Sequence, residues 1–183
     1  MFEDLEISGL KLVTPKKHGD ARGFFSETYN AETWREAGLE YEFVQDNHSL
    51  SRDAGTLRGL HFQAPPFAQD KLVRVARGSI LDVAVDLRRS SPTFKKYVAV
   101  ELSYDNWRQV FIPAGFAHGF ITLEPNTEVI YKVTNFYSHA HDFGVAWDDP
   151  EINIAWPMKK SEITLSEKDQ KLPKLRDVGN LFP

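Results

Sequence analysis

A series of short apolar runs, each closed by turn-forming residues, is the feature that most constrains how this chain can fold. The runs are rich in Val, Ile and aromatic residues, which favour β-strands, and Gly, Pro, Asn or Asp separates them. Their close, nearly regular spacing is typical of antiparallel sandwiches and barrels. The expected strands cover residues 10–14, 24–29, 43–51, 57–63, 71–77, 79–86, 97–102, 108–112, 119–123, 128–134 and 144–147.

Two short stretches fit helices better than strands. Residues 31–38 follow Asn30, a favourable N-cap, and stop at Gly38. A second helical turn is expected over 166–171, where Ser166 and Asp169 have the spacing of a capping box. Long amphipathic helical patterns are missing from the sequence. The pattern therefore predicts an all-β, antiparallel fold with a few short helices.

Length and composition exclude several classes of protein. The 183 residues suit one domain, and the apolar density falls after Trp156-Pro157, so the C-terminal tail is expected to wrap the surface. The absence of cysteine excludes disulfides, thiol nucleophiles and cysteine-ligated metals. A net charge of −4 argues against general nucleic-acid binding, although a local cluster of Arg and Lys could hold a small anion. The acidic N-terminus and the lack of a long apolar run indicate a cytoplasmic protein without a membrane span.

The segment 55–63 places Arg58 and His61 three residues apart in a strand-like run. Residues at odd spacing point to opposite faces of a strand unless the backbone bends, and Gly59 can supply a bulge that brings both side chains to one cavity. A histidine among apolar neighbours is also common as a core residue with one hydrogen bond. The segment alone leaves both interpretations open.

Two other strands carry polar side chains on an otherwise apolar face. Lys71 shares a face with Val73 and Val75. Its side chain either enters the interior, where it would meet an anion, or keeps its amine in solvent at the end of the strand. Tyr131 alternates with apolar residues in the same way, which suits either packing or a general acid.

The turn before His118, with Pro113 and Gly115, resembles the second motif of the cupin superfamily, where a metal-binding histidine often stands. Metal-binding cupins also supply a His-x-His pair and a glutamate from the first motif, whereas this chain has only His61 there. A catalytic metal usually needs three protein ligands, so we expect no metal. The pair His139 and His141 lies in a polar stretch and is interpreted as a solvated loop.

Several motifs, in order along nearly the whole chain, resemble the dTDP-4-dehydrorhamnose 3,5-epimerases, cupin-like sugar-nucleotide epimerases of deoxysugar synthesis. The matching stretches are DARGFFSE (20–27), QDNHSLS (45–51), GTLRGLHFQ (55–63), QDKLVRV (69–75), DVAVDLR (82–88), SPT (91–93), IPAGFAHGF (112–120), YK (131–132), WP (156–157) and LSEKD (165–169). The resemblance implies a jelly-roll, cupin-like barrel over residues 1–183, with an N-terminal strand segment and a C-terminal wrapping tail. It also implies a homodimer without metal or nicotinamide cofactor that inverts C3 and C5 of dTDP-4-keto-6-deoxyglucose.

The resemblance assigns chemical roles to four residues. His61 would be the base, Asp169 its dyad partner, Lys71 the group that stabilises the enolate oxygen, and Tyr131 the acid on the opposite face. Under this assignment the capping box and the dyad compete for the Asp169 carboxylate. The substrate-binding positions implied are Arg22, Glu27, Gln45, Asn47, Arg58, His118, Asp142 and Lys168.

Details of nucleotide binding follow from the same resemblance. Arg22 and Arg58 suit the diphosphate because guanidinium groups bind phosphate oxygens in pairs. His18 and Phe136 are candidates for stacking on thymine. Asp142 stands where the family usually has a glutamate, so its shorter side chain could contact the ligand through water.

Three alternatives remain open at this point. A near relative would invert only C3 or only C5 with almost the same catalytic residues. A metal-dependent cupin enzyme and a non-catalytic sugar-binding cupin are further alternatives, which the full polar set disfavours.

Overall fold

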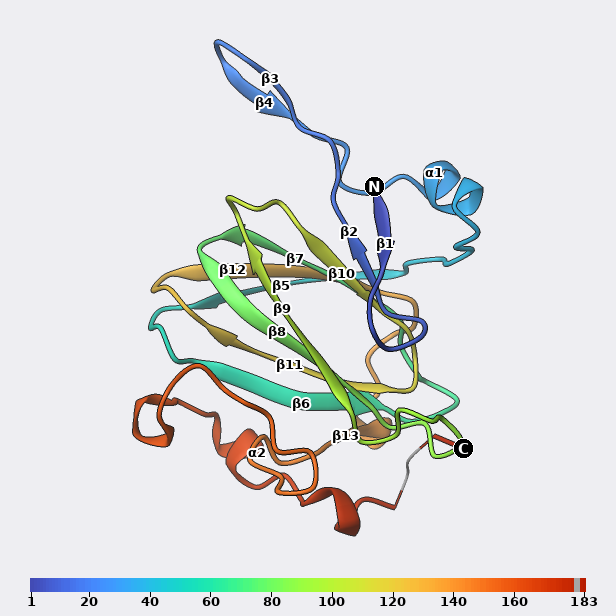
Figure 1. Cartoon of the computed structure of the whole chain (residues 1–183), viewed down its shortest axis with the longest axis vertical. Coiled ribbons are helices and arrows are strands. Elements are labelled where there is room, and N and C mark those ends of the chain that lie inside the picture. Colours follow the sequence, from blue (N-terminus) through green and yellow to red (C-terminus); the bar gives the residue numbers. More distant parts are fainter. Residues whose placement is uncertain (180–181) are drawn as a thin grey trace.

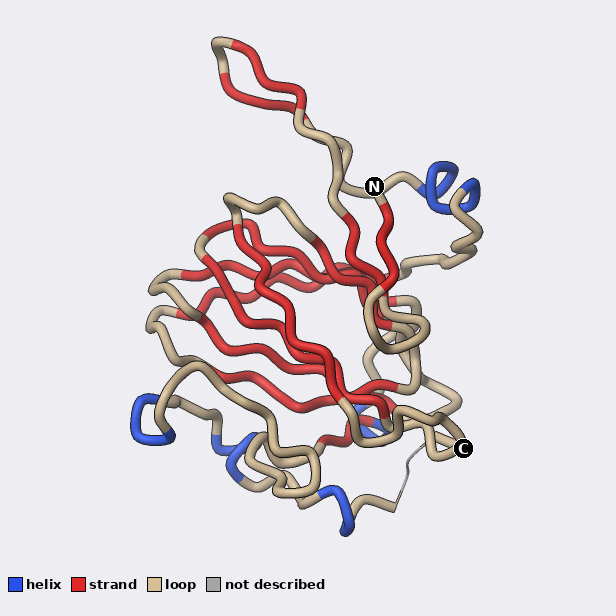
Figure 2. Tube along the Cα trace, viewed as in Figure 1, coloured by secondary structure: helices blue, strands red, loops and turns tan. Residues whose placement is uncertain are grey.

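The computed structural model describes residues 1–179 and 182–183, which form two facing antiparallel β-sheets and a small protruding hairpin (Figure 1). Strands are the main regular structure of the body, and the helices are short and peripheral (Figure 2). This arrangement confirms the expected all-β jelly-roll with a few short helices.

The six-stranded sheet contains, in the order in which its strands pair, β1 (Phe2–Asp4), β2 (Lys11–Val13), β10 (Gln109–Ile112), β7 (Lys71–Arg77), β12 (Thr127–Val133) and β5 (Gln45–Ser51). The five-stranded sheet contains β13 (Asp142–Gly144), β6 (Leu57–Gln63), β11 (Phe116–Thr122), β8 (Ser79–Asp86) and β9 (Tyr97–Ser103). The hairpin consists of β3 (His18–Asp20) and β4 (Gly23–Phe25). The helices are α1 (Ala31–Glu36) and α2 (Glu167–Gln170), with 3-10 turns η1 (His139–His141), η2 (Lys160–Glu162) and η3 (Leu175–Asp177).

The main core lies between the two sheets. Because strand side chains alternate, Val73 and Val75 of β7 point inward and pack with Ile80 of β8 and Phe116 and Phe120 of β11. All five side chains are buried. Each sheet therefore has one face committed to the sandwich interior.

The outer faces are covered as well. On the five-stranded sheet, Leu175, Val178 and Phe182 pack against Leu60 and Val83. Figure 1 shows the C-terminal segment, in orange and red, running along this sheet. The tail thus packs on this sheet and buries a second apolar cluster that the falling hydrophobic density did not indicate.

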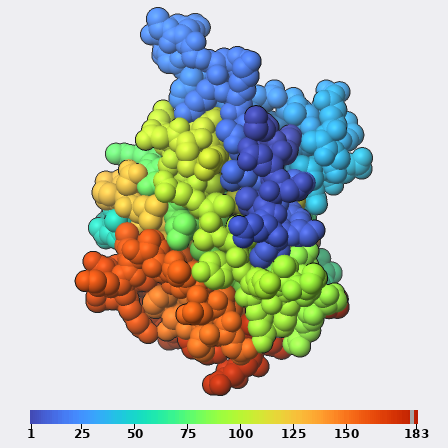
Figure 3. Space-filling view, viewed as in Figure 1, coloured from blue at the N-terminus to red at the C-terminus, as the bar shows by residue number. Residues whose placement is uncertain are grey.

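A third cluster covers the outer face of the six-stranded sheet, where Trp34 of α1 packs with Leu72 and Phe111. Asn30 caps α1 as expected, with its side chain accepting hydrogen bonds from the next turn. The hairpin, residues 18–25, stands away from all three clusters, and we call it the arm (Figure 3).

Two strand assignments from the sequence are wrong, and two strands were missed. The strand expected over 144–147 is β13, which ends at Gly144, and the one expected over 24–29 ends at Phe25. Strands β1 and β3 were not indicated at all. These are short, mostly exposed strands, so they lack the alternation of buried and exposed residues on which the assignment depends.

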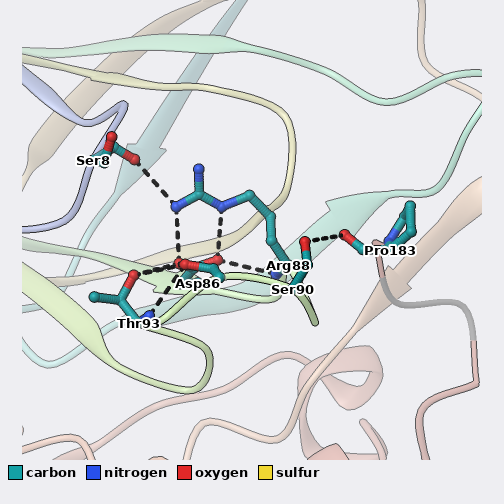
Figure 4. A network of polar contacts seen from close by, with 7 residues as sticks. Ser8, Asp86, Arg88, Ser90, Thr93 and Pro183 are labelled. Atoms are coloured by element: carbon teal, nitrogen blue, oxygen red, sulfur yellow. Dashed lines mark hydrogen bonds and ion pairs between the residues drawn. The ribbon is translucent and has the colours of Figure 1, made fainter.

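A buried carboxylate ties three parts of the chain together (Figure 4). Asp86 is fully buried and accepts hydrogen bonds from Arg88 Nη2 at 2.8 Å and Thr93 Oγ1 at 2.7 Å. Arg88 also donates to the carbonyl oxygen of Ser8 at 3.1 Å. Burial alone would raise the pKa of Asp86, but the hydrogen bonds from Arg88 and its neighbours outweigh burial and lower the pKa to about 2.

We expect Asp86→Asn to lower the free energy of unfolding by about 2 kcal/mol at pH 7, because the ionised carboxylate stabilises only the folded state. The folded-state pKa lies below the unfolded value near 4, so this stabilisation is complete above pH 5 and is lost as the pH falls toward 2. Urea unfolding of both proteins between pH 7 and pH 3 measures the difference. A difference that stays constant below pH 4 would contradict the assignment.

Candidate active site

A cavity opens between the two sheets and has two adjoining lobes. The first lobe measures about 490 Å³ and the second about 270 Å³. His61, Lys71, Tyr131 and Lys168 line both lobes, so the lobes form one continuous site. Cavities of this size accommodate small-molecule ligands.

One wall of the cavity comes from the inward face of the six-stranded sheet. Lys71 and Val73 are two residues apart on β7 and therefore share that face. Tyr131 of β12 pairs with Val73 on one side and with Asn47 of β5 on the other. The lysine and the phenol therefore lie on the same wall, and a polar edge strand continues it.

The opposite wall comes from β6 and β11, where His61 pairs directly with His118. The chain takes three steps from Arg58 to His61 where β11 takes two, from Phe120 to His118. Gly59 occupies this bulge with φ +132°, and a Cβ there would lie 2.6 Å from a Cα atom of β11. The expected bulge is confirmed, and Arg58 and His61 both line the first lobe.

His61 and Asp169 form an imidazole–carboxylate pair, with Nε2 to Oδ1 at 2.6 Å. Ser166 accepts a hydrogen bond from the backbone N–H of Asp169 at 3.1 Å, so the cap uses the N–H while the carboxylate contacts His61. The cap and the dyad therefore coexist on one residue.

The electrostatics of this pair determine which ring nitrogen is basic. Burial alone would raise the pKa of Asp169, but the hydrogen bond from His61 outweighs it and lowers the pKa. An ionised carboxylate can only accept, so His61 Nε2 carries the hydrogen and Nδ1 is left as the basic atom.

Burial determines the protonation states of Lys71 and Tyr131 on the wall formed by the six-stranded sheet. Burial lowers the pKa of Lys71 to about 8, against the opposing pull of the Asp142 and Asp82 carboxylates. Burial raises the pKa of Tyr131, and Arg58 only partly opposes this. Near neutral pH the lysine is therefore mainly charged and the tyrosine keeps its proton.

A second imidazole–carboxylate pair was not expected from the sequence. His118 Nε2 lies 2.8 Å from Asp82 Oδ2, and the residues are only 7% and 1% exposed. Asp82 alternates with Ile80 and Ala84 along β8, on the inward face. A carboxylate at an inward apolar position is the signal that could have identified it.

The second lobe contains another residue that the sequence analysis missed. Tyr137 lines this lobe and donates a hydrogen bond to Asp142 Oδ2 at 2.9 Å. Lys168 Nζ donates to the same oxygen at 2.5 Å. The neighbouring Phe136, named instead as an aromatic candidate, is 63% exposed and is not among the residues lining the cavity.

Ten of the twelve site residues named from the sequence line the cavity: His61, Lys71, Tyr131, Asp169, Gln45, Asn47, Arg58, His118, Asp142 and Lys168. The other two lie elsewhere. Arg22 sits at the tip of the arm, where its side chain is 90% exposed and pairs with Asp20. Glu27 lines a separate pocket beside α1, together with His18.

Within residues 1–179 and 182–183, no group of three or more His, Asp or Glu side chains is placed to hold a metal ion. His139 and His141 lie in η1 rather than in an irregular loop, and His141 Nδ1 contacts Ser138 Oγ at 2.8 Å. No helix of the described residues is long and apolar enough to cross a membrane.

The arrangement can move protons to and from a carbon atom. An imidazole base on one wall and a neutral phenol on the other can act on opposite faces of a bound ring. A cationic lysine beside the phenol can stabilise a negatively charged oxygen. These are the elements needed to deprotonate and reprotonate carbon next to a ketone.

Comparisons with known proteins point to the same chemistry. A family model described as dTDP-4-dehydrorhamnose 3,5-epimerase matches residues 4–177. An enzyme of that name from Sinorhizobium fredii is 53% identical over 181 residues, which cover 99% of this chain and 92% of that protein. The crystal structure of the Legionella pneumophila 3,5-epimerase in complex with dTDP-4-keto-L-rhamnose has a TM-score of 0.95 at 42% identity and covers 100% and 97% of the two chains. A 3′-monoepimerase from Streptomyces bikiniensis in complex with dTDP-quinovose has a TM-score of 0.88 at 34% identity and covers 94% and 86%.

We expect Asp82→Asn to lower the pKa of Lys71 below about 8, because a carboxylate that favours the charged amine is removed while the burial remains. NMR titration of ¹³C-labelled lysine side chains measures this directly. Asp149→Asn is the matched control, since Asp149 is 2% exposed but accepts hydrogen bonds only outside the cavity lining, from Glu151, Ile152 and Leu175. An unchanged Lys71 titration in Asp82→Asn would refute the coupling.

Proposed function

The chain belongs to the dTDP-4-dehydrorhamnose 3,5-epimerase family, and we propose that it inverts C3 and C5 of dTDP-4-keto-6-deoxyglucose in dTDP-L-rhamnose synthesis. The observation that carries the proposal is the His61–Asp169 pair on one wall of a cavity whose opposite wall holds Tyr131 and Lys71. An epimerase needs a base and an acid on opposite faces of its substrate, and this cavity supplies both.

In the proposed reaction, His61 Nδ1 takes the proton from the carbon beside the C4 ketone. The electron pair of the broken C–H bond moves into the ring and places negative charge on the ketone oxygen as an enolate. The Lys71 ammonium stabilises that charge, while ionised Asp169 stabilises the imidazolium that forms. Tyr131 then returns a proton to the carbon from the other face. The imidazolium of His61 releases its proton to solvent and the phenolate of Tyr131 takes one up, and the same steps then act at the second centre.

The remaining cavity residues are proposed to hold the nucleotide sugar: Gln45, Asn47, Arg58, His118, Asp142 and Lys168. Arg58 supplies a guanidinium fork for the diphosphate. Tyr137 is a better candidate for stacking on thymine than His18 or Phe136, because it lines the second lobe. Asp142 then acts through Tyr137 and Lys168, whose side chains it holds together.

We further propose a homodimer, because Arg22 and Glu27 match substrate-contacting positions of the family but lie outside the cavity of their own subunit. The arm also exposes Phe24 and Phe25, with 43% and 70% of their surfaces accessible. A second copy of the chain could receive the arm at its cavity and bury these rings. The single domain over residues 1–183 and the cytoplasmic location stay predictions.

The alternatives are separated by the substrate atoms that react. Higher identity to a 3,5-epimerase, 53%, than to a 3′-monoepimerase, 34%, favours inversion at both centres. A metal-dependent cupin enzyme would lose activity with a chelator, and a non-catalytic sugar-binding cupin would exchange no carbon-bound hydrogen.

We expect the protein to exchange hydrogen for deuterium at both C3 and C5 when dTDP-4-keto-6-deoxyglucose is incubated with it in deuterated water. NMR of the sugar follows each position, and a reductase that traps the product reports its configuration. His61→Asn should retain dTDP binding and lose exchange at both positions, because the base is removed and the binding residues remain. Exchange at one centre only would reassign the enzyme, and no exchange would refute enolate chemistry on this substrate.

The homodimer is tested by mixing Arg22→Ala and His61→Asn at a substrate concentration well below KM, where we expect each variant alone to show little activity, the first from weak binding and the second from loss of the base. If the arm serves the partner's cavity, each mixed dimer has one site with both defects and one intact site. Random exchange of subunits should then restore about a quarter of the wild-type activity, since a symmetric dimer has two equivalent sites. The pair His61→Asn and Asp169→Asn is the control and should restore nothing, because both residues lie in the same cavity. No recovery with Arg22→Ala would refute the exchange of arms.

A further inference from the structure

The arm leaves the body of the protein with almost no support along its length. All six residues of β3 and β4 are exposed, and Figures 1 and 3 show the hairpin projecting beyond the two sheets. A strand advances about 3.3 Å per residue, so a small change of angle at the base moves the tip by a large distance. The contacts at the base therefore determine where Arg22 is presented.

At the base of the arm, the Lys17 ammonium lies within a cage of three aromatic rings. Its Nζ is 4.1 Å from the ring centroid of Trp107, 4.7 Å from that of Phe24 and 5.1 Å from that of Tyr104. The same nitrogen donates to the carbonyl oxygen of Tyr104 at 3.3 Å. An ammonium within about 6 Å of a ring centroid is attracted by the negative face of the ring.

The cage joins three segments that are separate along the chain. Lys17 belongs to the segment entering the arm, Phe24 to the strand leaving it, and Tyr104 and Trp107 to the turn between β9 and β10. The rings also contact one another, with Phe24 and Trp107 edge to face at 5.0 Å. Trp107 Nε1 donates to Ser26 Oγ at 3.0 Å, which holds the outgoing segment on the same indole.

The turn that carries the cage is itself held rigidly. Asn106 Oδ1 accepts hydrogen bonds from the backbone N–H groups of Ser103 and Arg108, both at 3.0 Å. Ser103 Oγ accepts from the backbone N–H of Asn106 at 3.0 Å. The cage is thus anchored to the end of the five-stranded sheet, while Lys17 and Phe24 belong to the arm.

We propose that Lys17 is a positioning residue that fixes the angle of the arm, so that Arg22 reaches the cavity of a second copy of this chain. The inference rests on the proposed function for its consequence in catalysis, but the cage itself does not depend on it. Lysine suits this role because one ammonium can contact all three rings at once, whereas an apolar side chain would lack the electrostatic attraction. No chemistry at the substrate is assigned to Lys17.

The test replaces Lys17 by Met, which keeps an unbranched stem of similar length and removes the charge. Hydrogen–deuterium exchange of residues 18–25 should become faster, because the base of the arm is loosened. The Kd for dTDP and the KM for the keto sugar should each rise about three- to tenfold, with kcat changed less than twofold, since only placement of a binding arm is affected.

Two further variants separate the cage from general effects of substitution. Lys17→Arg retains a cation that stacks on aromatic rings, so it should preserve both the exchange rate of the arm and the Kd. Lys96→Met removes an exposed lysine from the turn between β8 and β9 and should leave both quantities at wild-type values. A loss in Lys17→Arg equal to that in Lys17→Met would overturn the assignment to the charge.

Unchanged exchange over residues 18–25 in Lys17→Met would show that the cage does not hold the arm and would overturn the proposal. Faster exchange with unchanged Kd and KM would equally overturn it, because the arm angle would then not matter for binding. If wild-type protein does not exchange the hydrogens at C3 and C5 of the keto sugar, the proposed function fails. The rate of backbone hydrogen–deuterium exchange in residues 18–25 and the Kd for dTDP still decide the role of Lys17 in that case.

Discussion

The cost of placing charge between two apolar sheets is the constraint on which the rest of this structure depends. Lys71, His61 and His118 all face the interior, and ionised groups there need partners. Asp169 and Asp82 supply carboxylates for the two histidines, and Asp82 also favours the charged form of the lysine. These carboxylates offset the cost of burying the histidines and the lysine. The same contacts leave one nitrogen of His61 basic and favour the charged form of Lys71. Stability and chemistry therefore depend on one set of contacts.

The C-terminal segment is part of the site for this reason. It brings α2 beside β6, where Asp169 meets His61, and it is held there by backbone hydrogen bonds from Leu57 to Thr164 and from Thr164 to Gly55. Leu175 and Val178 add apolar contacts to the outer face of the sheet. A tail that looks peripheral in the sequence therefore closes the cavity wall and completes the dyad.

The arm presents the opposite case, because its contacts with its own subunit end at the base. The cage around Lys17 holds that base, while Arg22 and the ring of Phe25 face solvent. Within one subunit, an exposed arginine at the tip and exposed aromatic rings have no evident use. Both become useful where an anionic nucleotide and a second protein surface are available, which links the placement of the arm to the proposed dimer.

The sequence by itself determined which residues form the central strands and which way they face. Alternation put Lys71 and Tyr131 each on a face shared with apolar neighbours, and Gly59 between Arg58 and His61 offered a bulge that could turn both toward one cavity; the structure shows that both faces point inward and that the bulge is present. Family resemblance, rather than spacing, supplied the chemical roles. Short exposed strands such as β1 and β3 were not predicted, because they have no buried face to create an alternation of apolar and polar residues.

Only the tertiary structure decided how distant residues share their contacts. Asp169 could have turned back to cap α2, but the fold brings it to a histidine 108 positions away. Strand register brings Asp82 into contact with His118, and the path of a loop places Tyr137 at the cavity. The arm holds Arg22 outside the cavity. Local periodicity fixes a face because it depends on neighbouring residues alone, whereas a pair across the chain depends on the packing of the whole molecule.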